Sequence, residues 1–279
     1  MLWKTFAFAD EAATDLDGQI AALVRNGLHG LEIRGVDGEN IVNISVEKAK
    51  EIRRKLDAQG LSVWSIGSPI GKIGVNDDFA PHKEQFLHTL ELADILGASH
   101  YRLFSFYIPS GVSPTDCRDE VIDRLGILCE LGKQSGLVLC HENEKGIYGD
   151  NAARCADLLS ALPALKAVFD PANFIQCGQD VREAWQLLRK RAAYLHIKDA
   201  LPDGKVVPAG CGVGYLADIL PDFAALGGDA LTIEPHLTVF SGLKDLECDG
   251  ETSAKMDTFA YPDNNAAFDA ACAALKKLL

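Results

Sequence analysis

Short apolar segments alternate with longer amphipathic segments along nearly the whole chain. The short segments have the continuous apolar character of buried parallel strands. The longer ones carry apolar residues at helical spacing, so the alternation is typical of βαβ units. We expect strands at residues 2–8, 31–34, 61–66, 99–104, 137–140, 165–169, 194–197 and 231–233. We expect helices at residues 14–26, 45–58, 78–96, 115–135, 150–159, 181–190, 215–226 and 264–279.

Eight such strand–helix units predict a closed (β/α)₈ TIM barrel, in which residues 1–279 form a single α/β domain. In this architecture the active site lies at the C-terminal ends of the strands. Residues 236–261 depart from the repeat, because they form a long loop after the eighth strand that is rich in Gly, Ser, Asp and Glu. Loops of that length are typically lids, partner surfaces or partly mobile segments, and all three interpretations stay open.

The composition is that of an ordinary globular protein, with 48% apolar and 24% charged residues. A net charge of −13 opposes extended contact with nucleic-acid phosphates and favours a small polar substrate. The eight cysteines form no CxxC pair, and no apolar run reaches the length of a membrane span. The N-terminus lacks the basic and apolar regions of a signal peptide. We therefore expect a cytoplasmic protein with no membrane partner, whose exposed helices are compatible with a homo-oligomer.

Four consecutive strands end in side chains that can bind a metal. Glu142 follows VLCH, Asp170 follows LKAVF, His196 follows AYL and Glu234 follows LTI. Because the C-terminal ends of barrel strands meet at one face, we expect these side chains to converge. Three carboxylates and one imidazole suit a single divalent ion, Mn²⁺ foremost, with Mg²⁺, Co²⁺ and Zn²⁺ as alternatives. Without a cation the carboxylates repel one another, so the sequence predicts a metal site.

Five motifs follow one another in order along the chain: HENEKGIYGD at 141–150, FDPANF at 169–174, HIKDA at 196–200, VPAG at 207–210 and IEPHL at 233–237. On these motifs the chain resembles the xylose-isomerase-like TIM barrels of the sugar phosphate isomerase/epimerase superfamily over nearly its whole length. The resemblance implies a divalent metal held by Glu142, Asp170, His196 and Glu234, and a carbohydrate substrate that chelates it. It also implies that Glu142 and Glu234 are catalytic, exchanging a proton beside a carbonyl through a metal-bound enediolate.

The chain departs from the family's ketose 3-epimerases at two substrate-contacting positions. Those enzymes have a histidine where this chain has Asn173, and an arginine where it has Pro202. In the segment GCGVG at 210–214, relatives often carry Glu and Asp where Cys211 and Val213 stand. These departures affect the substrate side of the site and leave the expected metal ligands intact.

Five side chains are candidates for substrate binding: Lys198, His236, Glu144, Asn173 and Arg102. Lys198 and His236 each lie two residues beyond an expected ligand, on the same side of the strand. Lys198 is equally suited to a structural ion pair with a carboxylate. Glu144 follows the first metal carboxylate in a charged loop. Arg102 either projects into the barrel mouth or pairs with Glu32 inside the barrel.

The leading hypothesis is a metal-dependent sugar isomerase or epimerase. A lyase or C-glycoside-cleaving enzyme acting on keto-sugars is the second, because Asn173 and the loop at 236–261 alter the substrate side of the site. A non-catalytic sugar-binding barrel is the third, and the four metal-competent side chains argue against it. A metal-dependent DNA endonuclease is disfavoured by the net charge of −13 and by the seven histidines, few of which lie at strand ends.

Overall fold

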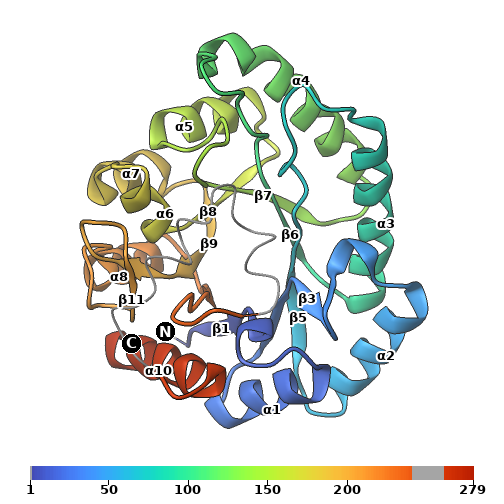
Figure 1. Ribbon diagram of the computed structural model, residues 1–279, viewed down its shortest axis with the longest axis vertical. Helices are drawn as coiled ribbons and strands as arrows, with labels where there is room; N and C mark the ends of the chain where they lie inside the picture. Colours follow the sequence, from blue (N-terminus) through green and yellow to red (C-terminus); the bar gives the residue numbers. More distant parts are fainter. Residues whose placement is uncertain (1, 241–260) are drawn as a thin grey trace.

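A closed barrel of parallel strands occupies the centre of the molecule (Figure 1), in a computed structural model that describes residues 2–240 and 261–279. Neighbouring strands follow one another in chain order, and the first strand pairs with the last to close the ring. This confirms the predicted (β/α)₈ TIM barrel. The barrel strands are β1 (Lys4–Ala7), β2 (Gly30–Ile33), β5 (Ser62–Gly67), β6 (His100–Leu103), β7 (Val138–Glu142), β8 (Lys166–Phe169), β9 (Ala192–Ile197) and β12 (Ala230–Ile233).

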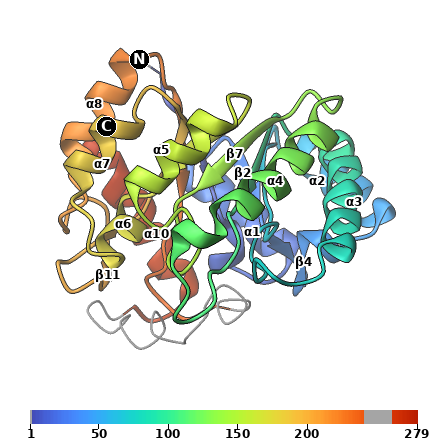
Figure 2. The same cartoon turned by 90° about the horizontal axis from the view of Figure 1, so that it is seen from above.

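Helices surround the barrel on its outside (Figure 1). In the view of Figure 2, α2, α3 and α4 lie on one side of the strands and α5, α7 and α8 lie on the other. No helix in the described ranges combines the length and apolar character that a bilayer crossing requires. The outer helices are α1 (Leu16–Asn26), α2 (Val46–Asp57), α3 (Ala80–Leu96), α4 (Pro114–Gly132), α5 (Ala152–Ala161), α7 (Val181–Leu188), α8 (Leu216–Ala225) and α10 (Asn264–Leu278).

Capping side chains fix where several of these helices begin. The Ser45 hydroxyl accepts a hydrogen bond of 3.1 Å from the backbone N–H of Lys48, so Ser45 caps α2. Asp15 caps α1 in the same way, through the N–H of Gly18. The first and last described helices pack together, and an ion pair of 2.9 Å joins Arg25 of α1 to Asp269 of α10.

Short elements that the hydrophobic pattern does not predict follow the C-terminal ends of the barrel strands. A hairpin of β3 (Gly35–Val36) and β4 (Glu39–Asn40) follows β2, and a hairpin of β10 (Asp199–Ala200) and β11 (Val206–Val207) follows β9. The 3₁₀ helices η1 (Ala9–Glu11) and η2 (Ile41–Asn43) follow β1 and β4, and helix α6 (Pro171–Gln176) follows β8. The long loop predicted at 236–261 begins just after β12. Its residues 241–260 lie outside the described residues.

The interior of the barrel is layered. Phe6, Cys140, Val168, Tyr194 and Ala230 form a buried cluster inside it. Cys140 and Tyr194 lie two residues before Glu142 and His196 on their strands, so each pair shares the inward face and the apolar cluster lies one layer lower. The predicted ligands therefore lie at the C-terminal end of the barrel, above this cluster.

Candidate metal centre

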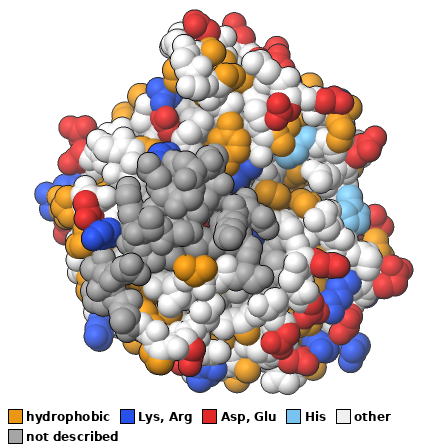
Figure 3. All heavy atoms as spheres, viewed as in Figure 1, with side chains coloured by type: hydrophobic (Ala, Val, Ile, Leu, Met, Phe, Trp, Pro, Cys, Tyr) orange, Lys and Arg blue, Asp and Glu red, His pale blue; other side chains and the backbone are white. Residues whose placement is uncertain are grey.

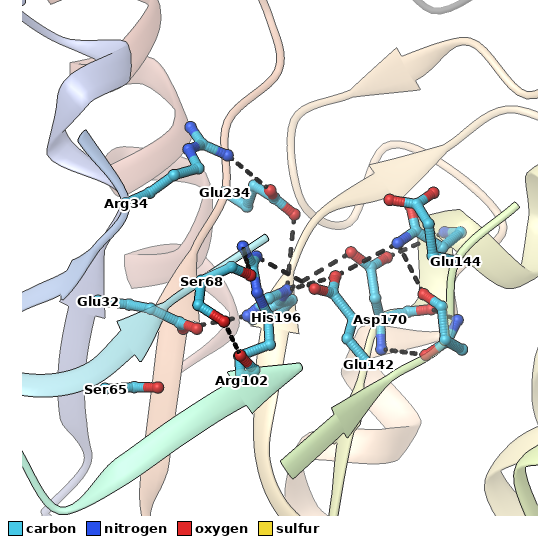
Figure 4. Close-up of polar contacts among 12 residues, drawn as sticks. Glu32, Arg34, Ser65, Ser68, Arg102, Glu142, Glu144, Asp170, His196 and Glu234 are labelled. Atoms are coloured by element: carbon cyan, nitrogen blue, oxygen red, sulfur yellow. Dashed lines mark hydrogen bonds and ion pairs between the residues drawn. The ribbon is translucent and has the colours of Figure 1, made fainter. Parts of the chain in front are cut away.

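The four predicted ligands converge at the C-terminal end of the barrel (Figure 4). They come from the ends of β7, β8, β9 and β12, and each is at most 3% exposed. One ligand atom from each lies within 4.8 Å of all the others. Around the Nδ1 atom of His196, the nearest carboxylate oxygens are those of Glu142 at 2.9 Å, Glu234 at 3.5 Å and Asp170 at 3.7 Å.

The side chain of Asn143, directly after β7, joins the end of β7 to the end of β8. The Asn143 amide donates to the carbonyl oxygen of Asp170 at 2.9 Å and accepts from its backbone N–H at 3.1 Å. The Oδ1 atom of Asp170 accepts from the N–H of Asn173 at 2.9 Å and so caps α6, where Pro171 is the first residue. The capping bond leaves Oδ2 of Asp170 to face the cluster.

Three buried cations compensate the ligand carboxylates. The Lys198 ammonium lies 2.8 Å from Asp170 and 2.8 Å from Glu234, which realises the ion-pair alternative for this residue. The Arg102 guanidinium lies inside the barrel and forms an ion pair of 3.1 Å with Glu142. Arg34, at the end of β2, holds the other oxygen of Glu234 at 3.1 Å. Each of the two glutamates therefore has one oxygen on an arginine and the other directed at the cluster.

The pKa values show how strongly the cluster attracts positive charge. Burial alone lowers the pKa of His196, but Glu142 and Glu32 raise it well above its usual range. Burial likewise lowers the pKa of Lys198, and Asp170 and Glu234 reverse the effect and raise it. The donor set is oxygen-rich, buried and convergent, which fits a hard divalent cation.

Comparison with models of protein families shows which family the chain belongs to. The model of the xylose isomerase-like TIM barrel family, AP_endonuc_2, matches residues 20–237. The chain belongs to this family. A search of curated proteins finds no match to the sequence.

Several solved structures share the fold of this chain at low sequence identity. An L-ribulose 3-epimerase is 19% identical with a TM-score of 0.74, over 100% of this chain and 95% of its own. The probable 3-DHS dehydratase AsbF from Bacillus anthracis is 18% identical with a TM-score of 0.70, over 94% and 100% of the two chains. The IOLI protein, described with a binding zinc atom, is 13% identical with a TM-score of 0.74, over 99% and 97%. At these identities the likeness establishes the fold alone.

Two of the predicted substrate-binding residues, Asn173 and Glu144, lie at or near the candidate metal centre. The Asn173 side chain donates to the Glu142 carboxylate at 3.3 Å and to the carbonyl oxygen of Asn143 at 2.9 Å. Glu144 is half-buried and forms an ion pair of 2.9 Å with Lys72 of the loop after β5. The structure thus places Asn173 against a ligand and Glu144 farther out, on a salt bridge between two loops.

His236 adjoins Glu234 in an unusual backbone conformation. Its φ of +44° lies in the left-handed region, which is strained for a residue with a side chain. Its backbone N–H donates to the carboxylate of Glu11 at 2.6 Å, and its Nε2 lies 3.5 Å from both Glu11 and Glu234. The ring stacks on Phe240, with 5.6 Å between ring centroids. Glu11, which the sequence reasoning missed, thus holds the backbone that carries His236.

Glu11→Gln is expected to flatten the pH dependence of stability of the metal-free protein. Burial raises the pKa of Glu11 from an ordinary 4.5 to about 8, even with Arg34 alongside. The folded state therefore keeps this proton where the unfolded state loses it. The stabilisation is complete below pH 4.5, declines as pH rises and is lost above about 8. Denaturant titrations from pH 4.5 to 8 measure this decline, and equal slopes in both proteins contradict the assignment.

The sequence reasoning did not place the ionisable residues at the end of β2 beside the four candidate ligands. Glu32 and Arg34 alternate with Leu31 and Ile33, so both carry their side chains to the same face of the strand. Glu32 lies 3.1 Å from the Nε2 of His196, and Arg34 reaches Glu234. The same search for ionisable residues at strand ends that found the four ligands applies to β2 and identifies this pair.

The segment GCGVG is organised by a buried carboxylate. Both oxygens of Asp199 accept hydrogen bonds from backbone N–H groups, those of Gly210 at 2.9 Å, Gly212 at 3.0 Å and Gly214 at 2.8 Å. A Cβ at Gly212 would lie 2.2 Å from the carbonyl oxygen of Ala200, which explains the glycine. The amide groups of this loop therefore bind an anion that belongs to the protein itself.

Asp199→Asn is expected to lower the free energy of unfolding by about 1–3 kcal/mol, because hydrogen bonds from the backbone N–H groups of the loop to a charged acceptor are weakened or lost. Chemical denaturation measures the loss. The matched control is Asp218→Asn, whose carboxylate is 66% exposed in a surface pair with Arg182. An equal effect of the two substitutions would show that the loop does not depend on Asp199.

Proposed function

We propose that the chain is a divalent-metal-dependent isomerase or epimerase that acts on a small sugar or sugar derivative. The observation that carries the proposal is the convergence of three buried carboxylates and one imidazole at the C-terminal end of the barrel. Mn²⁺ is the ion that we expect, because the donors are mainly hard oxygens. The zinc described for the IOLI protein supports a divalent ion and makes Zn²⁺ the first alternative to compare.

A divalent ion held by Glu142, Asp170, His196 and Glu234 supplies Lewis acidity, which makes a C–H beside a substrate carbonyl easier to deprotonate. Glu142 and Glu234 take and return the proton, since they approach the cluster from different strands, β7 and β12 (Figure 4). Arg102 and Arg34 fix the orientation of these two carboxylates.

The other residues around the cluster orient the substrate. Asn173 and Lys198 contact the ligand carboxylates directly and are placed to meet substrate oxygens beside them. His236 lies 3.5 Å from Glu234, Glu144 pairs with Lys72 farther from the cluster, and Arg102 acts from inside the barrel through Glu142. Asn173 is an amide where the ketose 3-epimerases have an imidazole, so it binds substrate oxygens without exchanging a proton.

The acidic surface supports a small substrate over a nucleic acid. The net charge is −13, and Figure 3 shows acidic side chains spread around the visible face with lysines and arginines interspersed. Binding to a phosphate backbone depends on a basic surface that releases counterions. These observations favour a small-molecule substrate over a nucleic acid.

Solvent hydrogen exchange tests the proposal. The metal-loaded chain is incubated in D₂O with a panel of aldoses, ketoses and keto-sugars, and incorporation of deuterium at carbon is followed by NMR and mass spectrometry. The proposal expects exchange beside a carbonyl that stops when the metal is removed by a chelator. A panel without any metal-dependent exchange contradicts proton transfer and favours the non-catalytic sugar-binding barrel.

Elimination is the second candidate function. Two observations favour it: Asn173 replaces the histidine of the epimerases, and one structural neighbour is named a probable dehydratase. Both reactions begin with loss of a proton beside a carbonyl, so the exchange experiment alone does not separate them. Product mass does, because an epimer keeps the mass of the substrate whereas elimination releases water or a second fragment.

A further inference from the structure

A chain of buried polar contacts runs below the metal centre, away from the barrel mouth. One oxygen of Glu32 lies 3.1 Å from Nε2 of His196, and the other accepts a hydrogen bond of 2.8 Å from the Tyr194 hydroxyl. Tyr194 in turn lies 3.1 Å from the hydroxyl of Ser65. All four side chains are fully buried. Figure 4 shows Glu32 reaching His196 from the side of the ring away from Glu142 and Asp170.

The local structure of the barrel is adapted to place Glu32 there. The pairing of β2 with β5 shifts register between Leu31 and Glu32, so that Glu32 stands opposite Ser65. Such irregularities re-aim side chains near active sites. At Gly67, a Cβ would lie 3.3 Å from Cγ of Glu32 and 2.6 Å from the ring of Phe8. The strand irregularity and the glycine together leave room for a carboxylate inside the barrel.

Burying a carboxylate in this position costs free energy unless neighbouring groups compensate its charge. Removing an ion from water costs several kcal/mol even after the protein relaxes. The neighbouring imidazole has two nitrogens with different surroundings, because Nδ1 of His196 faces the ligand carboxylates and Nε2 faces Glu32. A neutral imidazole can bind a metal only through the nitrogen that carries no proton, and a hydrogen bond at the other nitrogen decides which one that is.

We propose that Glu32 is a positioning residue for the metal centre, which keeps a proton on Nε2 of His196 and so reserves Nδ1 for the metal ion. Tyr194 supports this arrangement by holding the second oxygen of Glu32. The proposal rests on the proposed function, since it assigns a role to Glu32 only if a metal binds at the four ligands. It does not depend on which substrate is used or on whether turnover ends in epimerisation or elimination.

The nitrogen that binds the metal is tested directly in the wild-type chain. The protein is prepared with ¹⁵N-labelled histidine and loaded with ¹¹³Cd²⁺, a divalent NMR probe. We expect one-bond coupling between cadmium and Nδ1 of His196, with a slowly exchanging proton on Nε2. Coupling through Nε2 would overturn the proposal. No variant is needed, so a failure of a mutant to fold does not affect this measurement.

Metal affinity tests the role of Glu32 separately. Mutation of a hydrogen-bond partner behind a metal-binding histidine typically weakens metal binding about 10–100-fold. This is the effect expected in calorimetric titrations with Mn²⁺ and Zn²⁺ for Glu32→Met, which removes both acceptor oxygens and keeps a similar side-chain volume. Tyr194→Phe is expected to have a smaller effect on metal affinity. The matched control Ser65→Ala is expected to have none, because the Ser65 hydroxyl lies against the Tyr194 hydroxyl and not against Glu32 or His196. Denaturation in chelator checks that each variant folds.

The outcomes distinguish the proposed role of Glu32 from the proposed metal centre itself. If the wild type binds the ions and Glu32→Met binds them equally well, the role of Glu32 is wrong and the metal centre stands. If the wild type binds no divalent ion, the metal centre itself is wrong, and the role of Glu32 with it. A purely structural role for Glu32 predicts reduced stability in chelator without a change in the affinity of the folded protein.

Discussion

Glu234→Gln is expected to slow exchange of substrate hydrogen with solvent by a factor of about 10²–10⁴, the usual contribution of a positioned acid or base. The amide has nearly the shape of the carboxylate and keeps an oxygen for the metal, but it cannot accept a proton. Burial alone raises the pKa of Glu234, yet Lys198 and other neighbours lower it well below its usual range. The wild-type carboxylate is therefore ionised at neutral pH, the state in which it can accept a proton.

The measurement has to separate chemistry from metal loss. Deuterium incorporation is followed with excess metal, and metal content is determined on the same samples. The matched control is Glu130→Gln on the outer surface of α4, whose carboxylate is 75% exposed, and it should leave the rate unchanged. If the Glu234→Gln protein carries a full complement of metal and exchanges at the wild-type rate, Glu234 is not the acid or base.

The barrel and the convergence of the four candidate ligands could be predicted, because each follows from a local pattern. Strands buried on both faces have continuous apolar sequences, and their C-terminal ends meet at one face of a barrel. The prediction that Glu142, Asp170, His196 and Glu234 meet therefore needs no knowledge of side-chain contacts. Helix α6 was also within reach, because Asp170 followed by Pro171 is a typical helix start.

The contacts across the barrel could not be predicted from the sequence. Arg34 pairs with Glu234, 200 residues away, and Glu32 contacts His196, 164 residues away. Alternation along β2 shows that Glu32 and Arg34 share a face, but it does not show which partner each meets. That choice depends on the register shift between β2 and β5 and on the heights of the strands within the barrel. The ion pair of Lys198 could not be predicted either, because the sequence is equally compatible with a role of this residue in substrate binding.

Lys198→Met is expected to destabilise the metal-free protein by about 3–5 kcal/mol, the usual effect of removing one partner from a buried ion pair. The Lys198 ammonium is 4% exposed and lies 2.8 Å from each of two carboxylates, Asp170 and Glu234. Methionine fills a similar volume and supplies no charge, so both carboxylates lose their nearest cation. Chemical denaturation in chelator measures the loss. The control Lys205→Met removes an exposed ammonium 3.9 Å from Asp203 and should change stability by less than about 0.5 kcal/mol.

Addition of metal should reverse most of this loss, and the reversal distinguishes a metal centre from an ordinary salt bridge. A divalent ion at the four ligands neutralises Asp170 and Glu234 whether or not Lys198 is present. In the wild type the ion competes with an ammonium group for the same oxygens, whereas in Lys198→Met it does not. Metal should therefore stabilise the variant more than the wild type at equal saturation. If the variant is destabilised equally with and without metal, the ion does not bind at these carboxylates, and Lys198 is simply their structural counter-ion.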